Sequence, residues 1–373
     1  MIADLATSNY PYYDFSEPID PRSMLVDDQL FAELVSTGAF QRLKSIRFLG
    51  GIDYCLIRSP NGVRGNIRYT RYQHSLGVAR LAVSYSEMRA LSFSDRRLVY
   101  VAALLHDIGH APLSHSLEPV FADVFGLEHH RATENVITGR ELIGRDIYAI
   151  LRRHNVDIEL VVAIIAGKEL SYDGFFAGPI NFDTIEGILR SLAFIRPSPS
   201  IPSPEVVTKA ALRRDNTRDR DVVDEFWKYK NWIYQNVINS RAGVLADYAC
   251  QSFMRLHLDG IEKTDYFSTE DQMFRKLPGL MQLLTSPSFE ADIVERLDGP
   301  IKFKSRRFFV DTYADFFARA DKYRYKQDKY ERTLHLRGRI EATESLAKTD
   351  LFLRRRQWNG QENFRNPSSK TLD

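Results

Sequence analysis

The sequence predicts a mainly α-helical protein. Apolar side chains recur every three or four residues over most of the 373-residue chain, which is the spacing of one helix face. Stretches with the character of strands are short and fall only near residues 54–69 and 300–340. Hydrophobic residues make up 44% of the chain and charged residues 27%, an ordinary globular balance in a chain long enough for two domains or one elaborated domain.

Composition also favours a cytoplasmic protein. No apolar run reaches the roughly eighteen residues that a membrane span needs, so no membrane partner is expected. The start, MIADLATSNYPYYDF, lacks the basic region and apolar stretch of a secretory signal. Cys55 and Cys250 are too few for a disulfide framework, and reduced thiols are expected.

The N-terminal part of the chain predicts an arm, an interrupted helix and a small hairpin. Residues 1–19 are rich in aromatic and turn-forming residues and are expected to form an extended arm. Residues 29–46 have helical spacing that breaks near Gly38. Short strands are predicted at 54–57 and 66–69, on either side of the hairpin signal Asn61-Gly62.

Helical spacing then continues through most of residues 71–195. Residues 71–91 predict a long helix, and residues 95–105 predict an apolar one that leads into the motif LLHDIGHAPLSH at 104–115. Further helices are predicted at 116–125, 131–141, 144–153, 157–167 and 184–194.

Four prolines within residues 197–204 mark the best candidate domain boundary. Proline fixes φ and removes an amide donor, so this stretch is excluded from a helix interior. We therefore expect a core over 20–195, a proline-rich linker over 196–205, a mostly helical region over 206–356 with strands and helices after 301, and a disordered polar tail over 357–373.

The charge is unevenly distributed. Residues 301–373 hold eighteen Lys and Arg against ten Asp and Glu, although the whole chain carries only +2. A solvated basic helix face explains this excess, and so does a surface for anions, nucleic acid or an acidic neighbouring subunit. No recognisable nucleic-acid-binding module accompanies these residues, but nucleic acid is kept as a partner for the basic C-terminal region.

Histidines gather in one part of the chain. Six of the nine lie between positions 74 and 130. They are His74, His106, His110, His115, His129 and His130. Neutral imidazole and carboxylate are the usual ligands of Zn, Mn, Fe and related ions, so the cluster indicates a site. The alternative is structural: histidine near a helix C-terminus interacts favourably with the helix dipole.

Two segments carry a resemblance to a known family. TRYQHSLGVARLA and ALLHDIGHAPLSHSLE resemble the HD-domain metal-dependent phosphohydrolases, and most closely the branch of deoxynucleoside triphosphate triphosphohydrolases. FQRLKSIRFLGG and the Asp20-Pro21 pair fit the same branch. The likeness runs from about residue 18 to 195. It implies an HD-domain helical bundle with small β-hairpin elements and a mostly helical C-terminal extension.

The resemblance implies one divalent metal per site. His74, His106 and Asp107 match the first three ligands of the family, and Asp183 in INFDTIEGILRSL matches the fourth by position. Asp183 and Glu186 also fit a capping box at a helix start, which is the structural alternative. Mn, Fe or Mg are the first choices for such ligands, and Zn, Co or Ni are also accepted.

The resemblance also assigns catalytic groups. His115 would be the general acid, and Glu118 three residues later would orient it and raise its pKa. His110 and His129 would contact phosphate or the attacking water. Where the family has His-Glu, this chain has His129-His130, which leaves open which ring faces the site.

Substrate contacts follow the family less closely. Arg71 matches its phosphate-binding arginine. Phe48, beside Leu49, stands where a glutamine reads the sugar 3′-hydroxyl, and Thr184 stands where a base binds phosphate. Gly187 replaces a tyrosine that packs under the sugar, and Ser191 replaces an aspartate. Loss of such hydrogen-bonding groups changes selectivity by orders of magnitude.

The expected activity is metal-dependent hydrolysis of a nucleoside polyphosphate, most like a deoxynucleoside triphosphate triphosphohydrolase. One alternative is a phosphodiesterase or nuclease acting on cyclic or linear nucleic acid. A second is dinuclear chemistry, with His110 and His130 binding another metal. A third is a nucleotide-sensing module without catalysis. The resemblance further implies a homo-oligomer.

Overall fold

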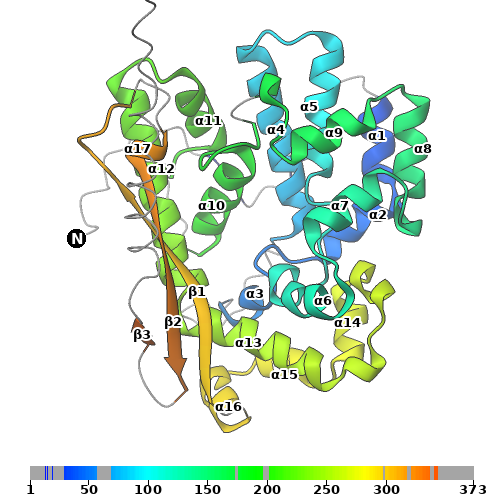
Figure 1. Cartoon of the computed structure of the whole chain (residues 1–373), viewed down its shortest axis with the longest axis vertical. Helices are drawn as coiled ribbons and strands as arrows, with labels where there is room; N and C mark the ends of the chain where they lie inside the picture. The colour runs from blue at the N-terminus through cyan, green and yellow to red at the C-terminus, as the bar shows by residue number, and fades with distance from the viewer. Residues whose placement is uncertain are drawn as a thin grey trace, which may run out of the picture.

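Helices dominate the structure and confirm the predicted fold class (Figure 1). The computed structural model describes Tyr13, Phe15, Ile19 and the ranges 29–56, 69–172, 175–195, 201–296, 299–316, 321–336 and 340–342. Most of the predicted arm, the Asp20-Pro21 pair, the Asn61-Gly62 turn and the tail over 357–373 lie outside the described residues.

The interrupted helix begins the described chain. It comprises α1 (Gln29–Ser36) and α2 (Gly38–Arg42), followed by a 3₁₀ turn, η2 (Leu43–Ser45). The predicted break is confirmed, because Thr37 accepts a hydrogen bond from Phe40 N and thereby caps a new helix.

The predicted strand at 54–57 is wrong over its described residues. Residues 51–56 form the helix α3 (Gly51–Leu56). Ile52 and Cys55, one helical turn apart, are buried where α3 packs against α13 (Arg241–Leu256). Packing against a helix distant in the sequence has overridden the local preference for a strand.

The central helices are α4 (Arg71–Met88) and α5 (Phe93–Leu105), which lie side by side (Figure 1). Thr70 and Ser92 cap them through their side chains. The other predicted helices of this region are present as α6 (Glu118–Phe125), α7 (His129–Ile137), α8 (Arg145–Arg153), α9 (Ile158–Ile165) and α10 (Phe182–Ile195).

The C-terminal region is helical up to a small sheet. Its helices are α11 (Pro204–Arg213), α12 (Thr217–Ile233), α13, α14 (Glu270–Lys276), α15 (Leu280–Leu284) and α16 (Phe289–Arg296). The antiparallel sheet has the order β1 (Pro300–Val310), β2 (Tyr325–His335), β3 (Ile340–Ala342), and a short helix, α17 (Asp321–Arg324), precedes β2. The indole of Trp227 on α12 donates to Phe309 O and Lys326 O, which fastens the hairpin to the helices.

One buried apolar core joins both parts of the chain. It extends from Ile19 to Leu336 and includes residues on either side of the proline-rich stretch. Pro204 is the first residue of α11, and Ser203 caps that helix. The division into a core and a C-terminal region therefore stays a prediction.

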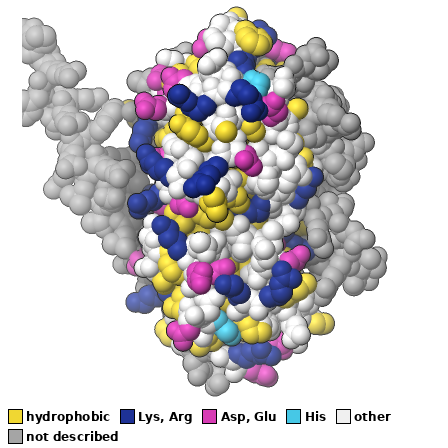
Figure 2. Space-filling view, turned by 90° about the vertical axis from the view of Figure 1, so that its right-hand side faces the viewer, with side chains coloured by type: hydrophobic (Ala, Val, Ile, Leu, Met, Phe, Trp, Pro, Cys, Tyr) yellow, Lys and Arg dark blue, Asp and Glu magenta, His cyan; other side chains and the backbone are white. Residues whose placement is uncertain are grey.

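One face of the molecule carries charges of both signs. Figure 2 shows Lys and Arg side chains on this face, with Asp and Glu side chains scattered among them and apolar side chains between. Among the described residues, no helix combines the length and the apolar character that a membrane crossing requires.

Candidate active site

Three predicted metal ligands meet between α4 and α5. His74 lies on α4, while His106 and Asp107 follow the last residue of α5, and their ligand atoms all lie within 4.8 Å of one another. His74 Nε2 is 3.2 Å from His106 Nε2 and 3.5 Å from Asp107 Oδ2. All three side chains are buried. Because the helix ends at His106, two consecutive residues can direct their side chains to one point.

Both histidines present the same ring nitrogen to this point. His74 Nδ1 lies 2.5 Å from Glu186 Oε2, and His106 Nδ1 lies 2.8 Å from Ala103 O. With Nδ1 donating in each ring, Nε2 keeps its lone pair for a metal ion. A carboxylate or carbonyl behind each imidazole is the usual support of a metal-binding histidine.

Glu186 was missed as a functional residue by reasoning from the sequence. It lies buried on α10 and also accepts from Arg190, one turn later. Gly77 on α4 makes room for it, since a Cβ there would lie 2.2 Å from Glu186 Oε1. The i, i+4 pair of Glu186 and Arg190 on an apolar helix face was the available signal.

Asp183 supplies a fourth donor. Its Oδ1 lies 3.1 Å from His74 Nε2 and 4.0 Å from His106 Nε2, and 46% of its side chain is exposed. The capping-box alternative is wrong, because Thr184 N donates to Asn181 Oδ1 and Glu186 is directed to His74. Asn181 therefore caps α10, and the carboxylate of Asp183 faces the histidines.

The donor set fits a divalent metal. Ligand atoms held at roughly 2.1 Å from one ion lie about 3.0 to 3.4 Å apart, close to the separations found between these side chains. Burial alone would raise the pKa of Asp107, but the charges of His106 and Arg71 hold it well below its usual range. Burial likewise opposes ionisation of Asp183, but the hydrogen bond with His74 lowers its pKa. Both carboxylates are thus ionised and ready to bind a cation.

Arg71 supports Asp107. Its Nη1 donates to Asp107 Oδ2 at 2.7 Å, its Nε to Ser114 Oγ at 3.1 Å and its Nη2 to Phe48 O at 2.8 Å. The buried guanidinium also lies over the Phe48 ring, 4.3 Å from its centroid. These contacts direct its donors to the protein, and phosphate binding by Arg71 stays a prediction.

The predicted catalytic residues form a second cluster. His110, His115, Glu118 and His129 place their ligand atoms within 4.8 Å of one another. His110 links them to the metal ligands, because its Nε2 lies 3.2 Å from Asp107 Oδ1. The rings of His110 and His129 stack in parallel at 4.5 Å, and His115 lies edge-on to both.

Glu118 pairs more closely with His129 than with His115. Both of its oxygens lie 2.9 Å from His129 Nδ1, whereas Oε2 lies 3.5 Å from His115 Nδ1. Burial opposes protonation of His129, but Glu118 outweighs it and raises the pKa of that ring. Glu118 acts on His115 in the expected direction and raises its pKa, but desolvation by the surrounding groups has a larger, opposite effect. The net shift of the His115 pKa is therefore downward.

The structure also distinguishes His129 from its neighbour His130 by orientation and exposure. The side chain of His129 is 17% exposed and faces His110, whereas His130 is exposed to solvent. His129 is thus the ring that faces the site.

The two departures from the family at Phe48 and Gly187 are adjacent in the structure. The Phe48 ring lies 4.6 Å from both the Tyr69 and the His74 rings. A Cβ at Gly187 would lie 2.7 Å from Phe48 Cζ, so the aromatic ring occupies the space of a larger residue at 187. Leu49 and Thr184 are partly buried. The backbone amide of Leu49 donates to Asp53, and that of Thr184 donates to Asn181.

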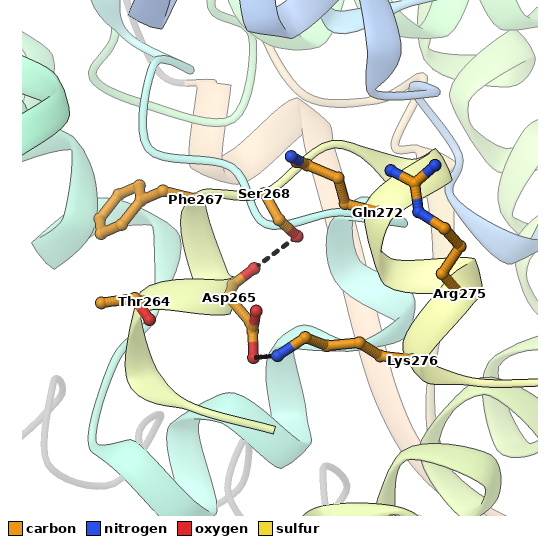
Figure 3. A pocket seen from close by; sticks show the side chains of 7 residues that line it. All are labelled: Thr264, Asp265, Phe267, Ser268, Gln272, Arg275 and Lys276. Atoms are coloured by element: carbon orange, nitrogen blue, oxygen red, sulfur yellow. Dashed lines mark hydrogen bonds and ion pairs between the residues drawn. The ribbon is translucent and has the colours of Figure 1, made fainter. Parts of the chain in front are cut away.

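A separate cavity of about 480 Å³ lies on the C-terminal side of the chain (Figure 3). It is lined by residues of η8 (Lys263–Phe267) and α14, and Lys276 there pairs with Asp265 at 2.6 Å. None of the predicted site residues lines it.

Comparison with known proteins identifies a domain that contains His74, His106, Asp107 and the second histidine cluster. Residues 71–174 match the family model of the HD domain. The chain is 32% identical over 227 residues to the "Uncharacterized protein MG461 homolog" of Mycoplasma pneumoniae, a match that covers 58% of this chain and 51% of that protein. It is 31% identical over 154 residues to the "Uncharacterized protein YwfO" of Bacillus subtilis, covering 40% and 33% respectively.

A relative with a named activity matches over a shorter stretch. The chain is 36% identical over 99 residues to the deoxynucleoside triphosphate triphosphohydrolase SAMHD1 of Bos taurus, covering 25% of this chain and 15% of that enzyme. The chain thus spans about half the length of its Mycoplasma relative and less of the other two. Residues 71–174 are thus similar to an HD domain, over less than a third of the chain.

Proposed function

We propose that the protein hydrolyses nucleoside polyphosphates in a metal-dependent reaction, with deoxynucleoside triphosphates as the first candidate substrates. The observation that carries the proposal is the convergence of His74, His106, Asp107 and Asp183 beside a cluster of histidines paired to Glu118. The match to SAMHD1, a deoxynucleoside triphosphate triphosphohydrolase, supports the substrate class.

A divalent ion held by these four residues would polarise a phosphoryl group and activate water for attack at phosphorus. His110 is suited to contact a phosphate oxygen or that water, because its buried Nδ1 has no hydrogen-bond partner among the described residues. His115 lies at the open side of the cluster, with 61% of its side chain exposed, and would protonate the leaving oxygen. Glu118 and His129 hold a proton beside it.

The proposal is tested by phosphate release from a panel of dNTPs, NTPs and dinucleoside polyphosphates, with Mn, Mg, Fe, Co or Ni added. Assays with and without pyrophosphatase distinguish triphosphate from orthophosphate as the product. His106→Ala and Asp107→Ala should abolish turnover, while the exposed Asp271→Asn should leave it unchanged. Absence of turnover for every nucleotide with every metal would refute the proposal.

Nucleic acid is a second candidate substrate, favoured by the β1–β2 hairpin. Every second residue of β1 from Lys302 to Arg306 is basic and exposed: Lys302, Lys304 and Arg306. Exposed Lys329 lies opposite Arg306 on the neighbouring strand. Lysine and arginine in such a row suit a phosphate backbone. Salt-sensitive binding of an oligonucleotide, with cleavage that is lost in His106→Ala, would favour this substrate over free nucleotides.

Dinuclear chemistry is distinguished by metal content. The cluster of His110, His115, Glu118 and His129 has donors that a second ion accepts, whereas exposed His130 lies outside it. We propose one metal per chain, because Glu118 already hydrogen-bonds His129 through both oxygens. Two metals per chain in the purified protein would replace this assignment.

A further inference from the structure

The carboxylate of Glu270, in the C-terminal region, accepts hydrogen bonds from three different segments near the catalytic histidines. Glu270 is the first residue of α14, and only 3% of it is exposed. Its Oε1 accepts from Arg47 N at 2.8 Å and from Leu113 N at 3.2 Å, and its Oε2 accepts from Tyr54 Oη at 2.6 Å. Glu270 lies well beyond the end of the matched HD domain at residue 174.

The contact with Leu113 falls on a strained turn. Leu113 and Ser114 have φ values of +56° and +46°, a left-handed conformation that side chains with a Cβ rarely adopt. Such backbone persists only where its surroundings fix it. Here Glu270 holds Leu113 N, while Ser114 Oγ donates to Arg47 O at 2.7 Å and accepts from Arg71 Nε.

The same C-terminal segment also holds the start of this loop. The buried Arg42 donates through Nη2 to His110 O at 2.8 Å and to Ile108 O at 3.1 Å, and through Nη1 to Ser268 O at 3.3 Å. Residues 268–270 therefore act on both ends of the 108–114 loop, which carries His110 and leads directly into His115.

A buried carboxylate is costly for a protein unless donors surround it. Glu270 has three such donors, and no Lys or Arg forms an ion pair with it among the described residues. Burial raises the pKa of Glu270 to about 7, against the effect of these hydrogen bonds. An apolar side chain of similar volume would avoid this cost but could not hold the 46–49 segment, α3 and the 113–114 turn together.

We propose that Glu270 is a positioning residue that fixes the Leu113–Ser114 turn and thereby orients His115 for proton transfer to the leaving group. The proposal rests on the hydrolytic function proposed above. It places part of the active-site architecture outside the HD domain, in the segment that begins α14.

Three variants separate hydrogen-bond geometry from charge. Glu270→Gln can keep every contact, with its oxygen on the two amides and its NH₂ donating to Tyr54 Oη, so kcat should stay within about threefold of the wild type. Glu270→Ala removes all the acceptors. Glu270→Asp keeps the carboxylate, but its shorter side chain places the oxygens too far from Leu113 N to accept a hydrogen bond. Both should lower kcat for a nucleotide by about 10- to 100-fold with little change in KM, within the range of general-acid catalysis. Asp271→Asn, on the same helix and exposed, is the matched control.

The leaving group gives the sharper readout. A p-nitrophenyl ester releases a stable phenolate that needs no general acid, so Glu270→Ala and Glu270→Asp should slow its hydrolysis by no more than about threefold. Equal losses on nucleotide and nitrophenyl ester would overturn the proposal, as would unchanged nucleotide turnover. Bound metal and Tm, measured for each variant, identify any variant that fails to fold, and Glu270→Asp then replaces Glu270→Ala.

Hydrogen–deuterium exchange tests the positioning without any substrate. Amides of residues 108–118 should exchange faster in Glu270→Ala and Glu270→Asp than in the wild type, with other helices unaffected. Unchanged exchange there would refute the role of Glu270 even if the wild type hydrolyses nothing. A wild type that is inactive on every ester refutes the proposed function, while the exchange result still decides whether Glu270 holds the turn.

Discussion

At the metal centre, a proton and a metal ion compete for His74. Burial opposes protonation of this ring, but Glu186 and the carboxylates of Asp183 and Asp107 outweigh it and raise its pKa to about 9. Below that pH the metal-free ring is protonated, so metal binding must release a proton. Apparent metal affinity should therefore rise about tenfold per pH unit from pH 6 to 9 and level off above it.

Chelator competition at a series of pH values measures this dependence. Glu186→Gln removes the principal charge that favours the protonated ring, so its profile should level off at a lower pH. An affinity that is independent of pH between 6 and 9 would show that His74 is neutral before metal binds.

The ring of Phe48 lies where a side chain at position 187 would have to be. Gly187→Ala places a Cβ against a ring already packed on Tyr69 and His74, so it should destabilise the protein by about 1 to 3 kcal/mol. Phe48→Leu should relieve that cost in the double variant. Thermal unfolding of the two single variants and the double variant measures the coupling. Gly38→Ala, with open space at its Cβ, is the control, and additive effects would contradict the account.

Phe48 also bears on selectivity. An aromatic face beside His74 cannot hydrogen-bond a sugar hydroxyl, so the site has no polar group there to reject a ribonucleotide or a deoxyribonucleotide. We expect kcat/KM for a dNTP and the matching NTP to differ by less than about tenfold. Competition assays with both nucleotides measure the ratio, and discrimination of a thousandfold would require another residue to read the sugar.

At the scale of elements, the close approach of α4 and α10 places Glu186 behind His74. Gly77→Ala would bring a Cβ to 2.2 Å from Glu186 Oε1, so the carboxylate must leave His74 Nδ1. Loss of such a supporting contact typically costs 10- to 100-fold in metal affinity. Metal titration of Gly77→Ala should show this loss, and Gly260→Ala, with nothing near its Cβ, should not. Wild-type affinity in Gly77→Ala would mean that Glu186 does not support the ligand.

The elements themselves were largely predictable from periodicity. Helices α4 to α10 begin and end within a few residues of the predicted ranges, because apolar residues recur at helical spacing along them. Most of them have one apolar face, while α4 and the second half of α5 are buried on nearly every side. The exception is α3, a short helix that is buried by α13, which lies far along the sequence. Local spacing holds no information about such a partner.

Part of the candidate site could likewise be predicted from the sequence, and part could not. His74, His106 and Asp107 lie in the two segments that carry the family resemblance, and the structure brings them together. Glu270 reaches the site through tertiary packing, and no motif marks it. Glu186 fits a capping box in the sequence, and only the packing of α10 against α4 directs it to His74. Phe48 and Gly187 are distant in the sequence. Their coupling is visible only in the structure, where the Phe48 ring fills the space beside Gly187.

At the scale of the whole molecule, the HD domain packs against the C-terminal helices. Asp247 on α13 accepts from Ser116 at 2.6 Å, and Glu270 accepts from Leu113, so both ends of the 113–116 segment contact the C-terminal region. The isolated segment 20–195 would lose these partners and expose the apolar faces that α11 and α13 cover. We expect it to unfold at a Tm at least about 10 °C below that of the full chain, or not to fold. A cooperative transition at the Tm of the full chain would show that 20–195 is an autonomous domain.

A metal titration decides whether hydrolysis depends on the ion that His74, His106, Asp107 and Asp183 would bind. Metal-stripped protein is titrated with Mn²⁺ while the products of dNTP hydrolysis are resolved by ³¹P NMR. Activity should rise from zero and saturate at one Mn²⁺ per chain, triphosphate should be released, and Asp107→Ala should show neither tight binding nor turnover. Hydrolysis that persists in the metal-stripped protein or in Asp107→Ala would contradict metal-dependent catalysis at this site.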